Sequence, residues 1–62
     1  MLTALKQKRM ERGLRQWDVA KQLGVNPATI SQWENRHAKP SQEQLRQLAE
    51  LYEVEVGELL DN

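Results

Sequence analysis

The chain of 62 residues lacks cysteine and phenylalanine and has only one histidine, two prolines and three glycines. Without cysteine it can form neither a disulfide framework nor a thiolate zinc site, and one histidine makes any other metal site unfavourable. No apolar run approaches the ~20 residues needed to span a membrane, and no signal peptide is visible. We therefore expect a cytoplasmic protein with no bound metal and no membrane contact.

The sequence also lacks the residue sets that carry catalysis. One histidine and no cysteine leave no Ser-His-Asp or Cys-His group, and the glycines are too widely spaced for a phosphate-binding loop. A chain of this length buries only about 60% of its unfolded surface, so we expect one domain, 1–62, with little room for a concave site. We predict that the protein is not an enzyme and has no cofactor and no small-molecule substrate.

The net charge is zero, but the charges are divided between the two parts of the chain. Residues 1–40 have eight Lys or Arg against three Asp or Glu, whereas residues 41–62 have one against six. Such a division is typical of a nucleic-acid-binding face opposed by a solvated acidic face. Scattered solvated charge on a small domain is the alternative interpretation.

The stretch 16–34, QWDVAKQLGVNPATISQWE, predicts two short helices joined by a tight turn. In Gln16–Leu23 the apolar residues follow one another at helical spacing and not in the alternation of a strand. Gly24 suits the left-handed conformation that ends many helices. Asn26 followed by Pro27 is typical of a helix start, because Asn caps the free amides and Pro needs no partner.

The second of these helices, Pro27–Glu34, has an unusual outer face. Its inner side is predicted to be Ile30 and Trp33, which we place in the core. Its outer side carries small or amide-bearing residues, namely Ala28, Thr29, Ser31 and Gln32. A helix without outward charge suits close contact with hydrogen-bonding edges, such as those in the DNA major groove.

Three further helices complete an all-α domain of five helices. The first is predicted over Met1–Arg12, where Thr3 is one possible cap and the chain terminus the other start. The fourth begins after Ser41, which suits the N-cap. The fifth is predicted over Val56–Leu60. Its last two residues are both leucine, so one packs inward and the other is available to a partner.

These motifs resemble the Cro/C1-type helix-turn-helix family, which includes the phage repressors. The resemblance covers Leu2 to Leu60 and depends on R-x-x-x-G-L, then Q-x-x-V-A-x-x-L-G-V-N-x-x-T-I-S-x-W-E-N, then P-S. It implies a compact, lambda-repressor-like domain of five helices with the helix-turn-helix core at 16–34. It also implies sequence-specific binding of double-stranded DNA by a transcriptional regulator, repressor-like, with helix 27–34 in the major groove.

The resemblance also implies roles for individual residues. Bases would be read by Pro27, Ala28, Ser31 and Gln32, with Gln32 as the main discriminator because its amide can bind adenine. The DNA backbone would be contacted by Arg15, Gln16, Asn26, Thr29, Asn35, Arg36 and Lys39. A homodimer on a palindromic site would form through Val56, Leu59 and Leu60.

A further implied feature is an ion pair between Arg9 and Glu34, which would join the first helix to the end of 27–34. Arg9 lies on an otherwise apolar stripe of the first helix, and a buried arginine there needs such a partner. The alternative is an exposed Arg9 that packs only its stem.

Three positions depart from the family pattern. Arg15 replaces a capping Ser or Thr, which indicates either a phosphate contact or a neutral substitution. Arg36 replaces a glycine, so either Arg36 takes a strained left-handed conformation or Asn35 takes it instead. Trp17 replaces a polar residue, and it either packs over the first helix or marks a protein-partner surface. The second function considered is therefore an antitoxin or another protein-interaction module that reuses the fold.

Overall fold

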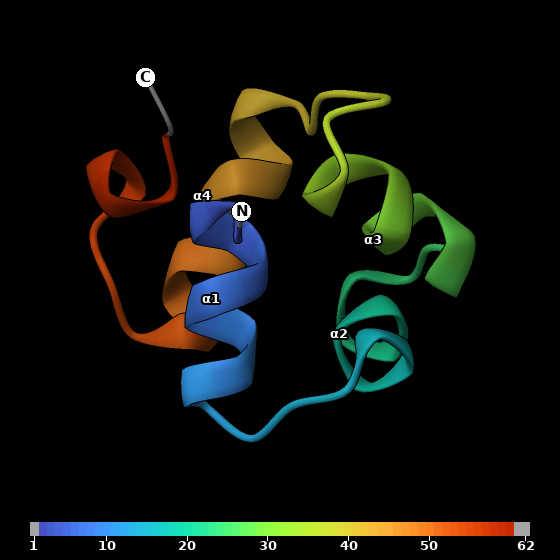
Figure 1. Cartoon of the computed structure of the whole chain (residues 1–62), viewed down its shortest axis with the longest axis horizontal. Coiled ribbons are helices and arrows are strands. Elements are labelled where there is room, and N and C mark those ends of the chain that lie inside the picture. The colour runs from blue at the N-terminus through green and yellow to red at the C-terminus, as the bar shows by residue number, and fades with distance from the viewer. Residues whose placement is uncertain (1, 61–62) are drawn as a thin grey trace.

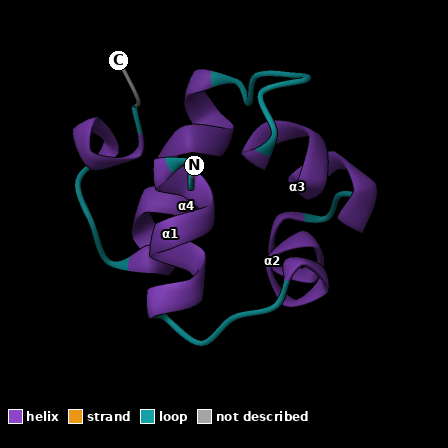
Figure 2. Cartoon of the chain, viewed as in Figure 1, coloured by secondary structure: helices purple, strands orange, loops and turns teal. Residues whose placement is uncertain are grey.

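The computed structural model describes residues 2–60, which form four α-helices and one short 3-10 helix (Figure 1). The elements are α1 (Ala4–Glu11), α2 (Gln16–Leu23), α3 (Pro27–Glu34), α4 (Gln42–Tyr52) and the 3-10 helix η1 (Val56–Leu59). The part of the chain that the structure describes contains no strand, and loops join the helices (Figure 2). The all-α prediction is therefore confirmed.

The predicted fifth α-helix, Val56–Leu60, is wrong in type, because this segment is the single 3-10 turn η1. Four residues are too few for the hydrogen-bonded ladder of an α-helix, and Gly57 lowers the helical preference further. The turn has no side-chain acceptor at its start other than Glu58, whose carboxylate accepts from the Glu55 amide at 2.9 Å. Residues 2–60 thus contain four α-helices and not five.

The first helix is shorter than predicted, because α1 begins at Ala4 after the N-cap Thr3. Thr3 Oγ1 accepts a hydrogen bond from the Lys6 amide at 3.4 Å, so the capping alternative is the observed one. The predicted start at Met1 lies outside the described residues. The helix ends just before Gly13, whose φ of +69° reverses the chain toward α2.

The tight turn between α2 and α3 forms as its residues predict. Gly24 ends α2 in the left-handed conformation with φ +71°, and Asn26 Oδ1 caps α3 by accepting from the Ala28 amide at 2.8 Å. Ser41 caps α4 in the same way, accepting from the Gln44 amide at 3.1 Å while Gln44 Oε1 accepts from the Ser41 amide at 2.8 Å. These local signals fix where α2 ends and where α3 and α4 begin, and these bounds agree with the prediction.

The core draws residues from all five elements and holds α2 and α3 side by side. Figure 1 shows this pair together, with α1 and α4 crossing next to it. Trp33 is 5% exposed, as expected of a core residue. The buried apolar residues are Leu5, Val19, Ala20, Ile30, Trp33, Leu48, Ala49, Tyr52 and Leu59.

The two consecutive leucines at the end of η1 face different environments. Leu59 is buried with 3% exposed, whereas Leu60 is 55% exposed. The proposed dimer contact therefore needs correction, because Leu59 belongs to the core and cannot also offer its side chain to a partner. Among the helices of residues 2–60, none combines the length and apolar character that a bilayer crossing requires.

Candidate nucleic-acid interface

The outer face of α3 is exposed and carries no charged side chain. Pro27, Ala28 and Gln32 are exposed, while Thr29 and Ser31 are half-buried. The Gln32 amide has no hydrogen-bond partner within residues 2–60. The Ser31 hydroxyl accepts from Asn35 Nδ2 at 3.2 Å, so it is already engaged. Sequence reasoning grouped these residues on one face, and the structure brings them together on α3.

The start of α2 compensates for its missing N-cap. Arg15 has no acceptor in its side chain, and instead Asp18 Oδ2 accepts from the Arg15 amide at 2.9 Å and from Arg15 Nε at 3.1 Å. These hydrogen bonds to the carboxylate hold the pKa of Asp18 below its usual value. The Arg15 side chain is 77% exposed, so it remains accessible on the surface beside the helix N-terminus.

A buried network ties the end of α3 to α1 and α2. Arg9 and Glu34 are 9% and 3% exposed, and Arg9 Nε donates to Glu34 Oε2 at 2.6 Å. Arg9 Nη2 donates to Glu34 Oε1 at 3.2 Å, and Nη1 donates to the Leu14 carbonyl at 2.8 Å. Thr3 Oγ1 donates to the Glu34 carbonyl at 2.9 Å. The alternative of an exposed Arg9 is therefore excluded.

Gln16 joins the same network, which sequence reasoning missed. Its Nε2 donates to Glu34 Oε1 at 3.0 Å, so one N–H of the amide predicted to bind phosphate is used within the protein. No pattern in the sequence pointed to this contact, because glutamine donates equally well to a carboxylate or to a phosphate. The amide retains a second N–H.

Tyr52, the last residue of α4, lies in the electrostatic field of this network. It is 1% exposed, and burial raises the pKa of its phenol far above the usual value. The Glu34 carboxylate raises the pKa further, and the Arg9 guanidinium opposes the rise. The raised pKa keeps the Tyr52 phenol in its neutral form.

The loop after α3 begins with a strained residue. Arg36 has φ +62°, whereas Asn35 has φ −97° and ends the helix in an ordinary conformation. Of the two alternatives for this turn, the structure therefore contains the strained arginine. The turn is closed by the Gln32 carbonyl, which accepts from the His37 amide at 2.8 Å. Arg36 and Lys39 are exposed on this loop.

A family model for the helix-turn-helix of the Cro/C1 type matches residues 5–59 of this chain. The chain belongs to the Cro/C1-type helix-turn-helix family. Its members are DNA-binding regulatory domains, so the unit formed by α2 and α3 is a DNA-binding helix-turn-helix. The chain matches no curated protein and no solved structure.

The basic and acidic residues of this Cro/C1-type domain are less separated in space than they are along the sequence. Lys8 Nζ lies 3.8 Å from Glu58 Oε1, and Arg12 Nη2 lies 3.4 Å from Glu53 Oε1. Both pairs join a cation of the first forty residues to an acid of the last twenty-two. Arg15, Arg36 and Lys39 are cations that are exposed next to α2 and α3 and take part in neither of these two pairs.

Trp17 lies on the surface of the helix-turn-helix and is 52% exposed. Its ring has Lys21 Nζ at 5.7 Å from the centroid, one turn along α2. Trp17 is therefore only partly covered, which argues against a role confined to packing over α1. The other large apolar residues exposed within residues 2–60 are Leu2, Met10 and Leu60.

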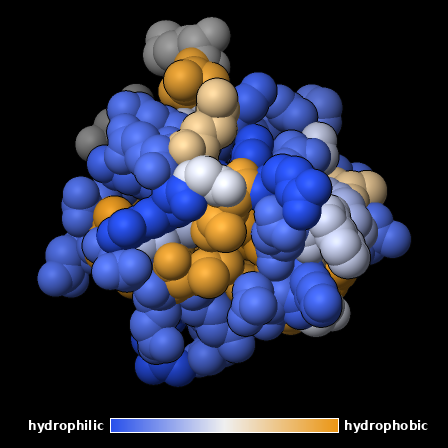
Figure 3. All heavy atoms as spheres, turned by 90° about the horizontal axis from the view of Figure 1, so that it is seen from below, coloured by the Kyte–Doolittle hydropathy of each residue, from blue (hydrophilic) through white to orange (hydrophobic). Residues whose placement is uncertain are grey.

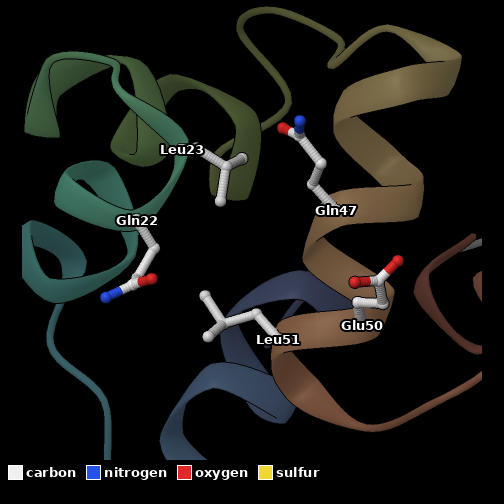
Figure 4. Close-up of a pocket in the computed structure, with 5 residues that line it drawn as sticks. All are labelled: Gln22, Leu23, Gln47, Glu50 and Leu51. Carbon is white, nitrogen blue, oxygen red and sulfur yellow. The ribbon is translucent and has the colours of Figure 1, made fainter.

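Apolar side chains also reach the surface between α2 and α4. Figure 3 shows a mostly hydrophilic face with an apolar patch near its centre. Figure 4 shows a shallow hollow in which Leu23 and Leu51 point toward the gap between the two helices, with Gln22, Gln47 and Glu50 around it. No group of three or more metal-ligating side chains occurs in the described part of the domain.

Proposed function

We propose that this domain is a sequence-specific transcriptional regulator of the repressor type that inserts α3 into the major groove of double-stranded DNA. The observation that supports this proposal is the uncharged, exposed face of α3. A surface helix usually directs charged side chains to solvent. Small and amide-bearing side chains fit base edges, which present neutral donors, acceptors and methyl groups.

Base reading depends mainly on Gln32. Its unpartnered amide can donate to N7 and accept from N6 of adenine, a bidentate contact that distinguishes this base. Ala28 lies one turn earlier on the same face and can pack on a thymine methyl. Ser31 contributes less because its hydroxyl already binds Asn35. Pro27 offers apolar contact only.

Phosphate binding would come from residues on both sides of α3. Arg15 and Gln16 lie at the N-terminus of α2, where free backbone amides also favour an anion. Arg36 and Lys39 are exposed on the loop after α3. The remaining residues proposed for the DNA backbone are Asn26, Thr29 and Asn35.

The regulator would act as a homodimer on a palindromic site. Two α3 helices related by a two-fold axis would then enter successive major grooves about 34 Å apart. Leu60, which is exposed, and Val56, which is half-buried, are the apolar residues proposed for the contact.

Selection from randomised duplex DNA at two salt concentrations tests the proposal. The expected result is an enriched palindrome bound with an affinity that falls steeply with salt, because phosphate contacts release counterions. Equal recovery of all sequences, or no binding at low salt, would contradict it.

The Gln32→Ala variant tests the assignment of the reader. We expect the loss of about 1–3 kcal/mol of discrimination at one base pair of the selected site, with other positions unchanged. Gln47→Ala, an exposed glutamine on α4, is the matched control and should leave base preference unaltered. An equal loss of affinity for every sequence would show that Gln32 does not read bases.

The exposure of Trp17 favours a second candidate function, capture of a protein partner as an antitoxin would do. Such a surface would be nearly indifferent to salt, whereas phosphate-mediated binding is not. Titration of a purified partner with wild type and Trp17→Ala distinguishes the two functions, because only partner binding should weaken in the variant.

A further inference from the structure

The contact between Gln16 and Glu34 links two parts of the interface that are separate in the sequence. Gln16 is the first residue of α2, and Glu34 is the last residue of α3. Gln16 Nε2 lies 3.0 Å from Glu34 Oε1, and Gln16 is half-buried. The residue proposed to bind phosphate is therefore held by the helix proposed to read bases.

Glu34 can fix the orientation of this amide because its carboxylate only accepts hydrogen bonds. An amide has a donor end and an acceptor end, and a rotation of 180° about its last bond exchanges them. With Glu34 as the partner, the rotated amide would place its oxygen against a carboxylate oxygen. The donor end of Gln16 is consequently kept at Glu34, and the oxygen is kept away.

Arg9 allows the Glu34 carboxylate to be buried where it accepts the hydrogen bond from Gln16. Glu34 is 3% exposed, and a buried carboxylate without a cation is strongly disfavoured. Two nitrogens of Arg9 bind both Glu34 oxygens, at 2.6 and 3.2 Å. The negative charge is thereby balanced within the protein, so it does not repel a phosphate that approaches the start of α2.

We propose that Glu34 is a positioning residue for DNA binding, and that it orients the Gln16 amide so that its second N–H is presented to a phosphate. The proposal rests on the proposed function, since it concerns how the same interface binds the DNA backbone. Glu34 itself touches no DNA in this arrangement. The angle of α3 and the direction of the phosphate donor are thereby set by one carboxylate.

A scan with methylphosphonate DNA tests the proposal. Each phosphate of the selected duplex is replaced in turn by a neutral methylphosphonate, and the affinity of each variant protein is measured. In wild type we expect about a tenfold loss at the phosphate bound by Gln16, since a hydrogen bond to a charged group is lost. Gln16→Ala identifies that phosphate, because the loss there should disappear in this variant.

Two substitutions of Glu34 then separate its effect on the orientation of the Gln16 amide from its effect on the stability of the fold. Glu34→Gln keeps the shape of the side chain but lets either end of the Gln16 amide face it. Glu34→Asp keeps the charge for Arg9 but withdraws the carboxylate by one methylene from Gln16. In whichever variant folds, methylphosphonate at the phosphate bound by Gln16 should lower the DNA affinity threefold or less. Methylphosphonate at the other phosphates should lower the affinity as much as in wild type. Ala49→Gly, a destabilising change on α4, should keep the wild-type pattern.

The outcomes distinguish this inference from the proposed function. If wild type binds no selected duplex, the proposed function fails. If wild type binds and Gln16→Ala leaves the scan unchanged, Gln16 is no phosphate donor and the inference is overturned. If the tenfold loss persists in a folded Glu34 variant, Gln16 binds phosphate without help from Glu34, and the inference is again overturned.

Discussion

The C-terminal ends of α3 and α4 have similar backbone turns, but the contacts that hold the two ends differ in burial. Each helix is followed by a residue other than glycine in the left-handed conformation, Arg36 with φ +62° after α3 and Glu53 with φ +58° after α4. An arginine also holds each end, Arg9 of α1 in one case and Arg12, which directly follows α1, in the other. Arg9 binds Glu34 in the core, whereas Arg12 donates to the Tyr52 carbonyl at 2.9 Å and is 41% exposed.

This comparison shows that the same kind of contact has different energetic consequences in different surroundings. A buried pair cannot lose one member without leaving a charge in a poorly solvated place. An exposed arginine can be replaced by water at little cost. The end of α3, which belongs to the proposed DNA interface, is the one held by a buried ion pair.

The largest effect is expected from breaking the buried contact. Arg9→Met should lower the free energy of unfolding by about 3–5 kcal/mol, because Glu34 would remain buried without its cation. Urea unfolding followed by circular dichroism measures this loss. A loss below 1 kcal/mol would show that the Arg9–Glu34 pair behaves like a surface ion pair. The ends of α3 and α4 would then not differ in the energy of their contacts.

Alkaline pH should act on the end of α4 through Tyr52. The pKa of its phenol is raised in the folded protein, so the stabilising neutral state is complete below the unfolded pKa of about 10. Above that pH the free energy of unfolding should fall by about 1.4 kcal/mol per pH unit, since the unfolded chain loses the proton first. Urea unfolding at several pH values gives the slope, and Tyr52→Phe should reduce it. An identical slope in both proteins would assign the alkaline loss to other groups.

The exposed counterpart of Arg9 should matter less. Arg12→Met removes a hydrogen bond to the Tyr52 carbonyl and a surface ion pair with Glu53, so we expect a loss of about 1 kcal/mol. The measurement is the same urea titration, run beside Arg9→Met. Equal losses in the two variants would contradict the role given to burial.

The smallest effects should come from glycine at the two left-handed positions. Relief of strain is partly cancelled by the greater freedom of glycine in the unfolded chain, so Glu53→Gly and Arg36→Gly should each gain about 0.5 kcal/mol. Only Arg36→Gly should also weaken DNA binding and flatten its salt dependence, because it removes a cation from the loop after α3. A similar loss of DNA affinity in Glu53→Gly would extend the interface to the end of α4.

Local signals account for what the sequence predicted well. Gly24, Asn26 and Pro27 act through the backbone next to them, and they placed the end of α2 and the start of α3 at the observed residues. The segment after Glu55 has no such signal. Its apolar residues suit a helix, but four residues form only a 3-10 turn.

Contacts between distant residues were harder to predict. The link from Gln16 to Glu34 depends on how two helices approach each other, and neither side chain has a single preferred partner. The charge division was overestimated for the same reason, since Lys8 and Arg12 bind acids near the other end of the chain. The family resemblance supplied the Arg9–Glu34 pair, which composition alone would not have revealed.

The two tryptophans give the protein two distinct fluorescent reporters. Trp33, at 5% exposed, should emit at short wavelength in the folded state and shift to the red on unfolding. Trp17, at 52% exposed, should already emit near the wavelength of a solvated indole and be accessible to acrylamide. The fluorescence of a variant that keeps only Trp33 therefore reports folding of the core. The fluorescence of a variant that keeps only Trp17 reports the binding of a molecule that covers this side chain on α2.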